Sequence, residues 1–345
     1  MGRPPGRSGK ISMNWKYKKV AITGATGFIG SWLTEDLVTR GAEVTILVRK
    51  DSPRGIRVLG KYADKVKIVY GDVREYDTMR SFVSDKDYIF HLAAITQVLY
   101  STTHPVDTFN IDANGTLNIL EAIRASSSQP FLIFQSTDKV YGEPNYVPID
   151  EGCGLSSKSP YDASKIAADR LVNSYFTSYG LKGTILRPSN VIGGRDANIW
   201  RAVPDFVLSI INNKPPTIRG NGKHIRDYTY VSDTVAAIRL AAEKQTKSNG
   251  EVFNIGTGKP TSVLDLSNLL IEVSGMKRKM KPVLMNKNTP SEIDKQYLTA
   301  AKARKLLGWV PKVSLKEGLK KTFEWYLQNP WWPSVIKDVE KYYSI

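Results

Sequence analysis

Short runs rich in β-branched residues alternate with helical patterns along this chain, and the alternation limits the possible folds more than any other feature. Strands separated by helices pair in parallel, because each helix returns the chain to the same end of the sheet. The sequence therefore predicts an α/β fold with a doubly wound parallel sheet, and a ligand site along the edge formed by the strand carboxyl ends. The expected strands span residues 19–23, 44–48, 66–70, 88–92, 131–135, 184–186 and 252–255.

Three glycines, Gly24, Gly27 and Gly30, follow the first expected strand and open the next helix. A glycine-rich turn in this position allows a tight bend and brings a pyrophosphate close to the backbone, while the helix N-terminus supplies N–H donors. The turn predicts dinucleotide binding by a Rossmann-type sheet. The contacts expected with the cofactor are Gly24, Thr26, Gly27, Phe28, Ile29, Gly30, Arg49, Asp72, Val73, Leu92, Ala93 and Ala94.

The second expected strand ends in Arg49, where an acidic residue would normally hold the ribose hydroxyls of NAD. A guanidinium can instead pair with the 2′-phosphate of NADP. NADP is therefore the favoured cofactor; Asp51 keeps NAD possible, and a plain surface charge at Arg49 is the alternative. Asp72 can accept a hydrogen bond from the adenine amino group, although an ordinary strand-end turn would also place it there. His91 lacks a partner at metal-ligand spacing and is interpreted as structural, so no metal site is predicted.

Tyr161 and Lys165 are four positions apart on an expected helix and therefore share one face. An ammonium near a phenol favours the phenolate and lowers the Tyr pKa, which would make Tyr161 a base. The alternative is a ring packed under an aliphatic stem. The preceding run Ser136, Thr137, Asp138 and Lys139 adds candidate proton-handling groups.

Composition limits the class of protein. The chain has 345 residues, 41% of them hydrophobic and 24% charged, without an apolar run long enough to span a membrane and without an apolar signal segment near its start. Its one cysteine, Cys153, cannot form an intrachain disulfide, which is typical of a cytoplasmic protein. The net charge of +16 would attract a phosphorylated substrate or a polyanion. Because the basic residues are scattered and no nucleic-acid-binding motif accompanies them, we expect no nucleic-acid partner.

Changes in residue composition along the chain predict its domains. We expect a basic flexible tail over residues 1–15, a dinucleotide-binding domain over 16–187 and about 231–257, and a smaller discontinuous substrate lobe over about 188–230 and 258–330. Residues 331–345 form a C-terminal extension, because Pro330 ends the last expected helix.

Several segments together resemble the extended short-chain dehydrogenases that act on nucleotide-diphosphate (NDP) sugars, over about residues 18–327. The Thr137–Asp138–Lys139 triplet resembles CDP-glucose 4,6-dehydratases, whereas the end of the second strand at Arg49 is more similar to GDP-mannose 4,6-dehydratases, which leaves the nucleotide base open. The segments that carry the resemblance are residues 24–30, 91–94, 110–116, 136–141, 161–165, 187–190, 226–231, 292–298 and 307–309.

The resemblance implies a role for each proton-handling residue. Tyr161 would be the base on the C4 hydroxyl, with Thr137 as its hydrogen-bonding partner, and Lys165 would hold the nicotinamide ribose, so that Tyr161 and Lys165 also contact the cofactor. Asp138 would protonate the departing C6 hydroxyl. Lys139 stands where many relatives carry Glu, and it could take the C5 proton only with a lowered pKa. The alternative is that Asp138 and Lys139 form an ion pair at a turn.

The resemblance also suggests the substrate contacts and a partner. Arg219 and Arg226 would bind the diphosphate, Asn190 would bind the diphosphate or the sugar, and Gln97 and Arg195 are further candidates. Helices expected over about 110–125 and 161–178 carry apolar residues on more than one face, which predicts a homodimer through four helices, or else core packing.

Three functions fit these observations. The first is an NDP-sugar 4,6-dehydratase acting on CDP-glucose or a related hexose. The second is an NDP-sugar 4-epimerase, in which the positions after the Ser or Thr are usually small or non-acidic, so that Asp138 favours dehydration. The third is a non-catalytic NAD(P)-binding sensor, against which Thr137, Tyr161 and Lys165 argue, because binding alone needs no phenolate base.

Overall fold

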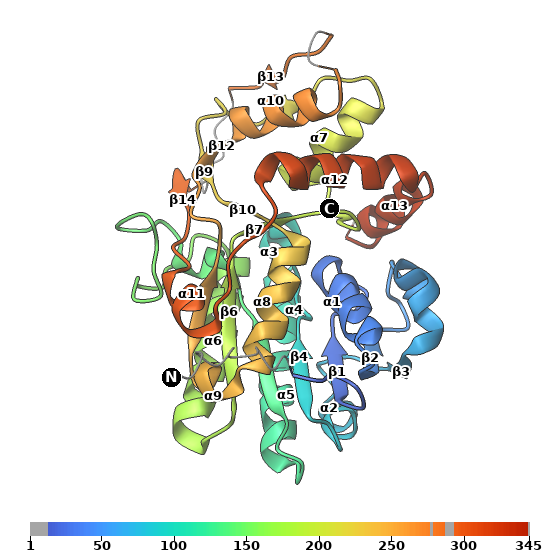
Figure 1. Ribbon diagram of the computed structural model, residues 1–345, viewed down its shortest axis with the longest axis vertical. Coiled ribbons are helices and arrows are strands. Elements are labelled where there is room, and N and C mark those ends of the chain that lie inside the picture. Colours follow the sequence, from blue (N-terminus) through green and yellow to red (C-terminus); the bar gives the residue numbers. More distant parts are fainter. Residues whose placement is uncertain (1–12, 277–278, 287–292, 344–345) are drawn as a thin grey trace, which may run out of the picture.

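The computed structural model describes residues 13–276, 279–286 and 293–343, and its centre is a seven-stranded parallel sheet (Figure 1). The strand order is β11-β6-β5-β4-β1-β2-β3. Every neighbouring pair in it is parallel, which confirms the predicted sheet. The strands are β1 (Lys19–Thr23), β2 (Glu43–Val48), β3 (Lys67–Tyr70), β4 (Tyr88–His91), β5 (Phe131–Gln135), β6 (Gly183–Pro188) and β11 (Val252–Ile255).

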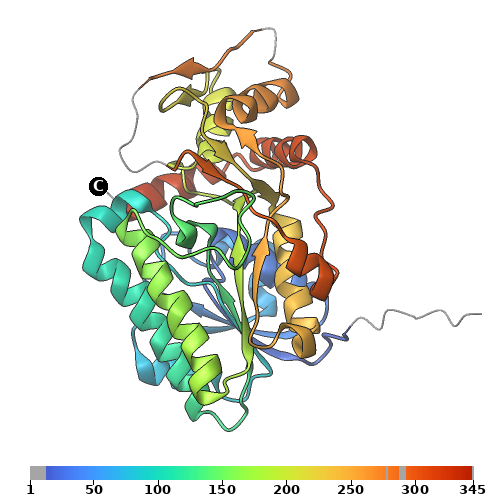
Figure 2. The ribbon, with the colours of Figure 1, turned by 90° about the vertical axis from the view of Figure 1, so that its left-hand side faces the viewer.

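Helices cover both faces of the sheet (Figure 2). On one face α1 (Phe28–Thr39) packs against α8 (Val231–Glu243); on the other, α5 (Gly115–Ala125) lies between α2 (Tyr76–Val83) and α6 (Pro160–Tyr179). One buried apolar cluster fills each side. Strand β1 has β4 on one side and β2 on the other, so the chain order reverses at β1. A doubly wound sheet binds its ligand at such a switch point.

A smaller lobe lies above the carboxyl edge of the sheet (Figure 1). It contains α7 (Ala202–Ile211), α10 (Val263–Val273) and α12 (Leu315–Gln328), with the short strands β8 (Thr217–Ile218), β9 (Ile225–Arg226), β12 (Thr261–Ser262), β13 (Val283–Leu284) and β14 (Lys295–Gln296). The strands β7 (Asn190–Ile192) and β10 (Tyr228–Tyr230) pair in parallel where the chain enters and leaves the first part of the lobe. The elements of the smaller lobe therefore come from two separate stretches of the chain.

Two predicted boundaries differ from the structure. Helix α11 (Ala301–Leu307), expected in the lobe, packs on β11, α8 and α9 (Gln245–Ser248) of the larger domain, and the indole of Trp309 behind it donates to the Asp233 carbonyl at 2.8 Å. The predicted tail falls outside the described residues up to residue 12, but Trp15 is buried, with its ring centroid 5.3 Å from that of Tyr88. A buried indole is part of the core, so the folded region reaches further towards the N-terminus than residue 16.

One buried ion pair joins three of these elements behind the sheet edge. Arg187 of β6 donates to Asp169 of α6 through two nitrogens, at 2.6 and 2.9 Å, and Ser136 after β5 donates to the same carboxylate at 2.7 Å. Arg187 also donates to the Tyr141 hydroxyl at 3.0 Å. Breaking one side of a buried ion pair leaves an uncompensated charge, which costs far more than losing an exposed pair.

We predict that Asp169→Ala lowers the free energy of unfolding by about 3–5 kcal/mol, because the Arg187 guanidinium then stays buried without its anion. The matched control is Glu143→Ala, which breaks the exposed Lys158–Glu143 pair (2.8 Å) and should cost less than about 1 kcal/mol. Urea denaturation of both variants measures the difference. Equal losses in the two variants would contradict the role assigned to the buried pair.

Candidate functional site

The glycine turn lies at the switch point and opens α1. Gly24 has φ +70°, and a Cβ there would lie 2.7 Å from the backbone carbonyl carbon of Leu92, so only glycine fits. A Cβ at Gly30 would collide with the Gly24 carbonyl oxygen. Gly27 is the N-cap of α1 and provides no side-chain cap. The first N–H groups of the helix therefore remain available to an anion, and this turn fits the pyrophosphate of a dinucleotide.

The other predicted turn residues line the same start of α1, with Phe28 buried and Thr26 and Ile29 half-buried. Sequence reasoning missed Arg54, whose terminal nitrogen would lie 3.6 Å from a Cβ placed on Gly27. Burial lowers the pKa of Arg54, and the charge of Asp196 opposes that effect. A guanidinium at this turn adds a positive charge facing a pyrophosphate.

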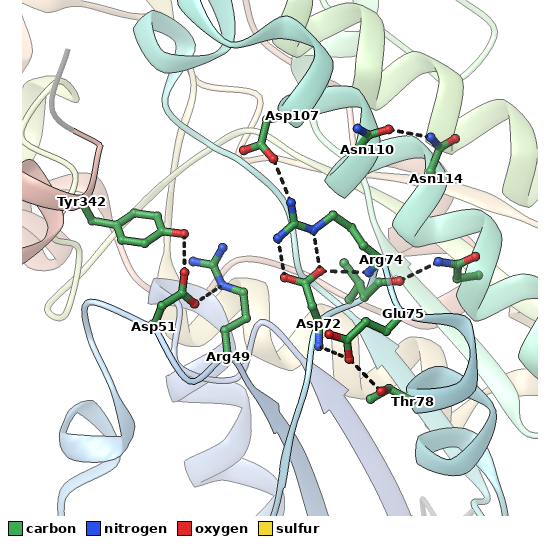
Figure 3. A network of polar contacts seen from close by, with 12 residues as sticks. Arg49, Asp51, Asp72, Arg74, Glu75, Thr78, Asp107, Asn110, Asn114 and Tyr342 are labelled. Carbon is green, nitrogen blue, oxygen red and sulfur yellow. Dashed lines mark hydrogen bonds and ion pairs between the residues drawn. The ribbon is translucent and has the colours of Figure 1, made fainter.

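Charged side chains gather where β2 and β3 end (Figure 3). Arg49 and Asp51 form an ion pair, with 3.8 Å between Nε and Oδ1. Arg74 pairs with Asp72 at 3.0 Å and with Asp107 at 3.0 Å. Burial acts to raise the pKa of Asp72, but its hydrogen bonds to Arg74 outweigh burial and leave the pKa below its ordinary value. The carboxylate is thus an acceptor next to Arg49, where an adenosine is expected.

The exit of β4 is held close to β1. The backbone N–H groups of Leu92 and Ala93 both donate to the Thr23 hydroxyl at 3.2 Å, and Leu92, Ala93 and Ala94 are half-buried. Both ring nitrogens of His91 are hydrogen-bonded, at 2.6 Å to Thr23 and 3.0 Å to Thr116, and burial lowers its pKa to about 3. The imidazole is therefore neutral and structural, as predicted. Val73 is buried behind this edge.

Tyr161 and Lys165 are both buried near the start of α6, at 8% and 3% exposure. The Lys165 ammonium donates to the Gln135 carbonyl at 3.0 Å and lies 4.7 Å from the centre of the Phe134 ring. Burial raises the pKa of Tyr161 above its ordinary value; Asp112 adds to this effect, whereas Arg201 and a hydrogen bond from Thr137 lower the pKa. The expectation that Lys165 lowers this pKa was wrong for the chain alone, because desolvation outweighs the neighbouring charges.

Thr137, Asp138 and Lys139 lie at a 3₁₀ turn, η3 (Asp138–Tyr141), directly after β5. Asp138 is 2% exposed, and its Oδ2 atom is buried without a hydrogen-bond partner among the described residues. Its Oδ1 atom lies 3.6 Å from the Lys139 ammonium. Burial lowers the pKa of Lys139, and the charge of Arg226 lowers it further. The ion pair raised as an alternative is present, and the second oxygen of Asp138 takes no part in it.

Gln296 on β14 of the smaller lobe contacts this turn. Sequence reasoning missed Gln296 as a functional residue. Its amide accepts a hydrogen bond from the Lys139 ammonium and donates to the Asp138 carbonyl at 2.9 Å. Gln296 pairs in register with Arg226 on β9, which explains why the Arg226 charge acts on Lys139. The smaller lobe thus contributes the Gln296 side chain to the site.

The remaining predicted substrate residues lie in different surroundings. Asn190 begins β7 and donates to the Asp227 carbonyl at 3.2 Å, and Gln97 is buried and accepts from Asn198 at 3.0 Å. Arg219 is exposed and acts electrostatically on Asp205 of α7. Arg195 pairs with Glu35 of α1 at 2.5 Å and stacks 4.7 Å from the Trp32 ring, so its guanidinium joins the lobe to α1.

Two more charged residues next to Tyr161 escaped prediction. Asp112 lies in a π-helical turn (Asn110–Asn114), where it accepts from the Ile95 N–H at 2.7 Å and from the Ser164 hydroxyl at 2.8 Å. Burial raises its pKa to about 6, and Lys165 opposes the shift. Arg201, before α7, pairs with Asp196 at 3.2 Å. An acidic residue in an expected helix and an arginine in a loop carry no local signal for such positions.

Within the described residues there is no cluster of His, Cys, Asp or Glu able to hold a metal ion, and no helix long and apolar enough to cross a membrane.

Comparison with known proteins places this site in a family. The family model for GDP-mannose 4,6 dehydratase matches residues 21–322. A putative UDP-glucose 4-epimerase of Methanocaldococcus jannaschii is 33% identical, covering 90% of this chain and 99% of that protein. The human dTDP-D-glucose 4,6-dehydratase is 31% identical, covering 94% and 95%.

A solved structure shows the same architecture. The dTDP-glucose 4,6-dehydratase of Streptomyces venezuelae, determined with NAD bound, superposes with a TM-score of 0.83 at 25% identity, covering 92% of this chain and 99% of that one. The match over nearly the whole chain, with the glycine turn and the residues around Tyr161 in place, shows that this protein belongs to the GDP-mannose 4,6 dehydratase family, within the extended short-chain dehydrogenases that act on NDP-sugars as dehydratases and epimerases.

Proposed function

We propose that this enzyme is an NDP-sugar 4,6-dehydratase that acts on CDP-glucose or a related hexose. Dehydratases and epimerases are similar to the chain at nearly the same identity, so the choice rests on the site. The observation that carries the proposal is the unpartnered, buried Oδ2 atom of Asp138 beside Thr137 and Lys139. A 4-epimerase handles protons at C4 alone, whereas loss of water across C5 and C6 needs an additional acid and base.

The residues divide the proton transfers among them. Tyr161, as the phenolate stabilised by a hydrogen bond from Thr137, takes the proton of the C4 hydroxyl and becomes the neutral phenol. Lys139 takes the proton from C5, and Asp138 gives a proton to the departing C6 hydroxyl, which leaves as water. A bound dinucleotide would supply the hydride acceptor for C4 and the hydride donor for C6. Lys139 would then return its proton to C5, so that the reaction has no net oxidation.

The Asp138–Lys139 contact supports this division. The Lys139 ammonium lies 3.6 Å from Oδ1 of Asp138, so the proposed base and the proposed acid are neighbours at one turn. Desolvation disfavours the charged forms, and burial already lowers the pKa of Lys139. Burial therefore favours the neutral amine that a base at C5 requires.

The proposed cofactor is NADP. Arg49 at the end of β2 provides a guanidinium for a 2′-phosphate, while the nearby carboxylate of Asp51 would be the contact for NAD. Lys165, which stays near the backbone of Gln135, would hold the nicotinamide ribose.

A homodimer through α5 and α6 is also proposed. Exposed apolar side chains flank these helices, including Val106 (74% exposed), Phe109 and Tyr179. Two antiparallel copies of such helices form a four-helix contact.

We predict that purified enzyme incubated with CDP-, GDP-, UDP- and dTDP-hexoses forms a product lighter by one water from one of them, as read by mass spectrometry. Asp138→Asn should slow water loss about 10²–10⁴-fold, because the amide cannot donate the proton. Nicotinamide absorbance should still show C4 oxidation in this variant. The exposed Asp64→Asn is the control. A product of unchanged mass with altered stereochemistry would show an epimerase instead.

The role of Lys139 predicts a pH dependence. Because burial raises the pKa of Tyr161, and because Lys139 must be neutral, turnover should increase with pH through the alkaline range. Lys139→Arg keeps the positive charge but cannot lose its proton, so it should abolish incorporation of solvent deuterium at C5 while leaving C4 oxidation measurable. Deuterium incorporation at the wild-type rate would rule out Lys139 as the base.

The proposed cofactor leads to a binding prediction. Arg49→Ala should weaken NADP binding by about tenfold or more and change NAD binding by less than about twofold, because only NADP carries the paired phosphate. Isothermal titration calorimetry measures both dissociation constants. An equal loss for the two cofactors would mean that Arg49 does not contact the 2′ position.

A further inference from the structure

The C-terminal helix α13 (Trp332–Tyr342) lies near the end of β2 (Figure 1). No family motif in this chain predicts this position for the helix. Trp332 is fully buried, and its indole donates to the Asp196 carbonyl at 3.4 Å. Val335, Ile336 and Val339 are buried on the same side of the helix, and Asp338 forms an ion pair with Arg57. These contacts fix α13 in place, so the side chains at its end have defined positions.

The helix places Tyr342 beside Arg49 and Asp51, the two residues that would contact the adenosine ribose (Figure 3). The Tyr342 hydroxyl donates to Oδ2 of Asp51 at 3.1 Å. The Tyr342 ring centroid lies 5.0 Å from the guanidinium carbon of Arg49, a cation–π contact. The next residue, Tyr343, also contacts Arg49 and packs 5.1 Å from the Tyr100 ring.

These contacts have different effects on Asp51 and Arg49, the two side chains that would contact the 2′ position of the ribose. A carboxylate recognises the ribose hydroxyl of NAD by accepting its hydrogen bond, but Asp51 already accepts from Tyr342 on one oxygen and faces Arg49 with the other. A guanidinium has five donors in a planar fork, so Arg49 can keep its contacts with Asp51 and Tyr342 and still bind a phosphate. Tyr342 therefore occupies the Asp51 carboxylate, which would bind the ribose of NAD, and orients the Arg49 guanidinium, which would bind the 2′-phosphate of NADP.

We propose that Tyr342 is a cofactor-specificity residue, which sequesters the Asp51 carboxylate and holds the Arg49 guanidinium towards the 2′ position of the cofactor ribose. The proposal rests on the proposed dinucleotide function and adds the residue that sets the preference for NADP. Tyr342 acts through Asp51 and Arg49 and is thus a positioning residue.

Two substitutions separate the two effects. Tyr342→Phe keeps the ring over Arg49 and removes the bond to Asp51, so NADP binding should change by less than about twofold, whereas NAD binding should tighten by about fivefold as the carboxylate is released. Tyr342→Ala removes both contacts, and NADP binding should weaken by about tenfold. Dissociation constants for NADPH and NADH, from nucleotide fluorescence, provide the readout, and thermal unfolding checks that the fold is kept.

A double-mutant cycle makes the mechanism specific. In an Asp51→Ala background, Tyr342→Phe should no longer change NAD binding, because the released group is absent. Tyr17→Phe, at an exposed tyrosine before β1 and so at the opposite end of the parallel strands from Arg49, is the matched control. The proposal is overturned if Tyr342→Phe leaves the NADPH-to-NADH ratio unchanged, or if its effect persists without Asp51. A wild-type protein that binds neither dinucleotide would instead contradict the proposed function.

Discussion

The buried pair of Asp169 and Arg187 is the contact on which the geometry of the site depends. Asp169 belongs to α6, the helix that carries Tyr161 and Lys165, and Arg187 belongs to β6. The same carboxylate accepts from Ser136, the residue before Thr137. One anion therefore ties the helix with the proposed base to the segment before the turn with the proposed acid, next to the bond from Lys165 to the Gln135 carbonyl. Among the described residues no backbone hydrogen bond joins α6 to this turn, so side chains fix their separation.

Desolvation is the strongest electrostatic influence around Tyr161. Desolvation raises the pKa of Tyr161 and of Asp112 and lowers the pKa of Lys165 and of Lys139. In each case its effect is larger than that of any single charged neighbour. All four shifts favour neutral groups. The proposed base at C4 is a phenolate, so its formation works against this desolvation, and Arg201 and Thr137 are the groups that lower the Tyr161 pKa.

Local sequence patterns were sufficient for the sheet and for the glycine turn. Five-residue β-branched runs and a glycine with positive φ are local features, and β1, β5 and β11 have the bounds predicted for them. Gln296, Arg54 and Tyr342 act at the site through contacts between segments far apart in the chain, such as the pairing of β14 with β9. No period or spacing encodes such contacts. The pKa of Tyr161 was predicted wrongly because the charge of Lys165 is visible in a sequence whereas burial is not.

Gln296 lies where the smaller lobe meets the turn that carries the proposed acid and base. In the proposed reaction, Thr137, Tyr161 and Lys165 of the Rossmann-type domain would carry out the oxidation at C4. The proposed elimination would depend on a turn that the smaller lobe contacts from β14, where Gln296 binds both the Lys139 ammonium and the Asp138 carbonyl. Relatives with either activity are 31–33% identical over most of the chain, so overall identity does not separate the two activities. The proposed dehydration instead depends on the groups at a single 3₁₀ turn, where β14 of the smaller lobe contacts the Rossmann-type domain.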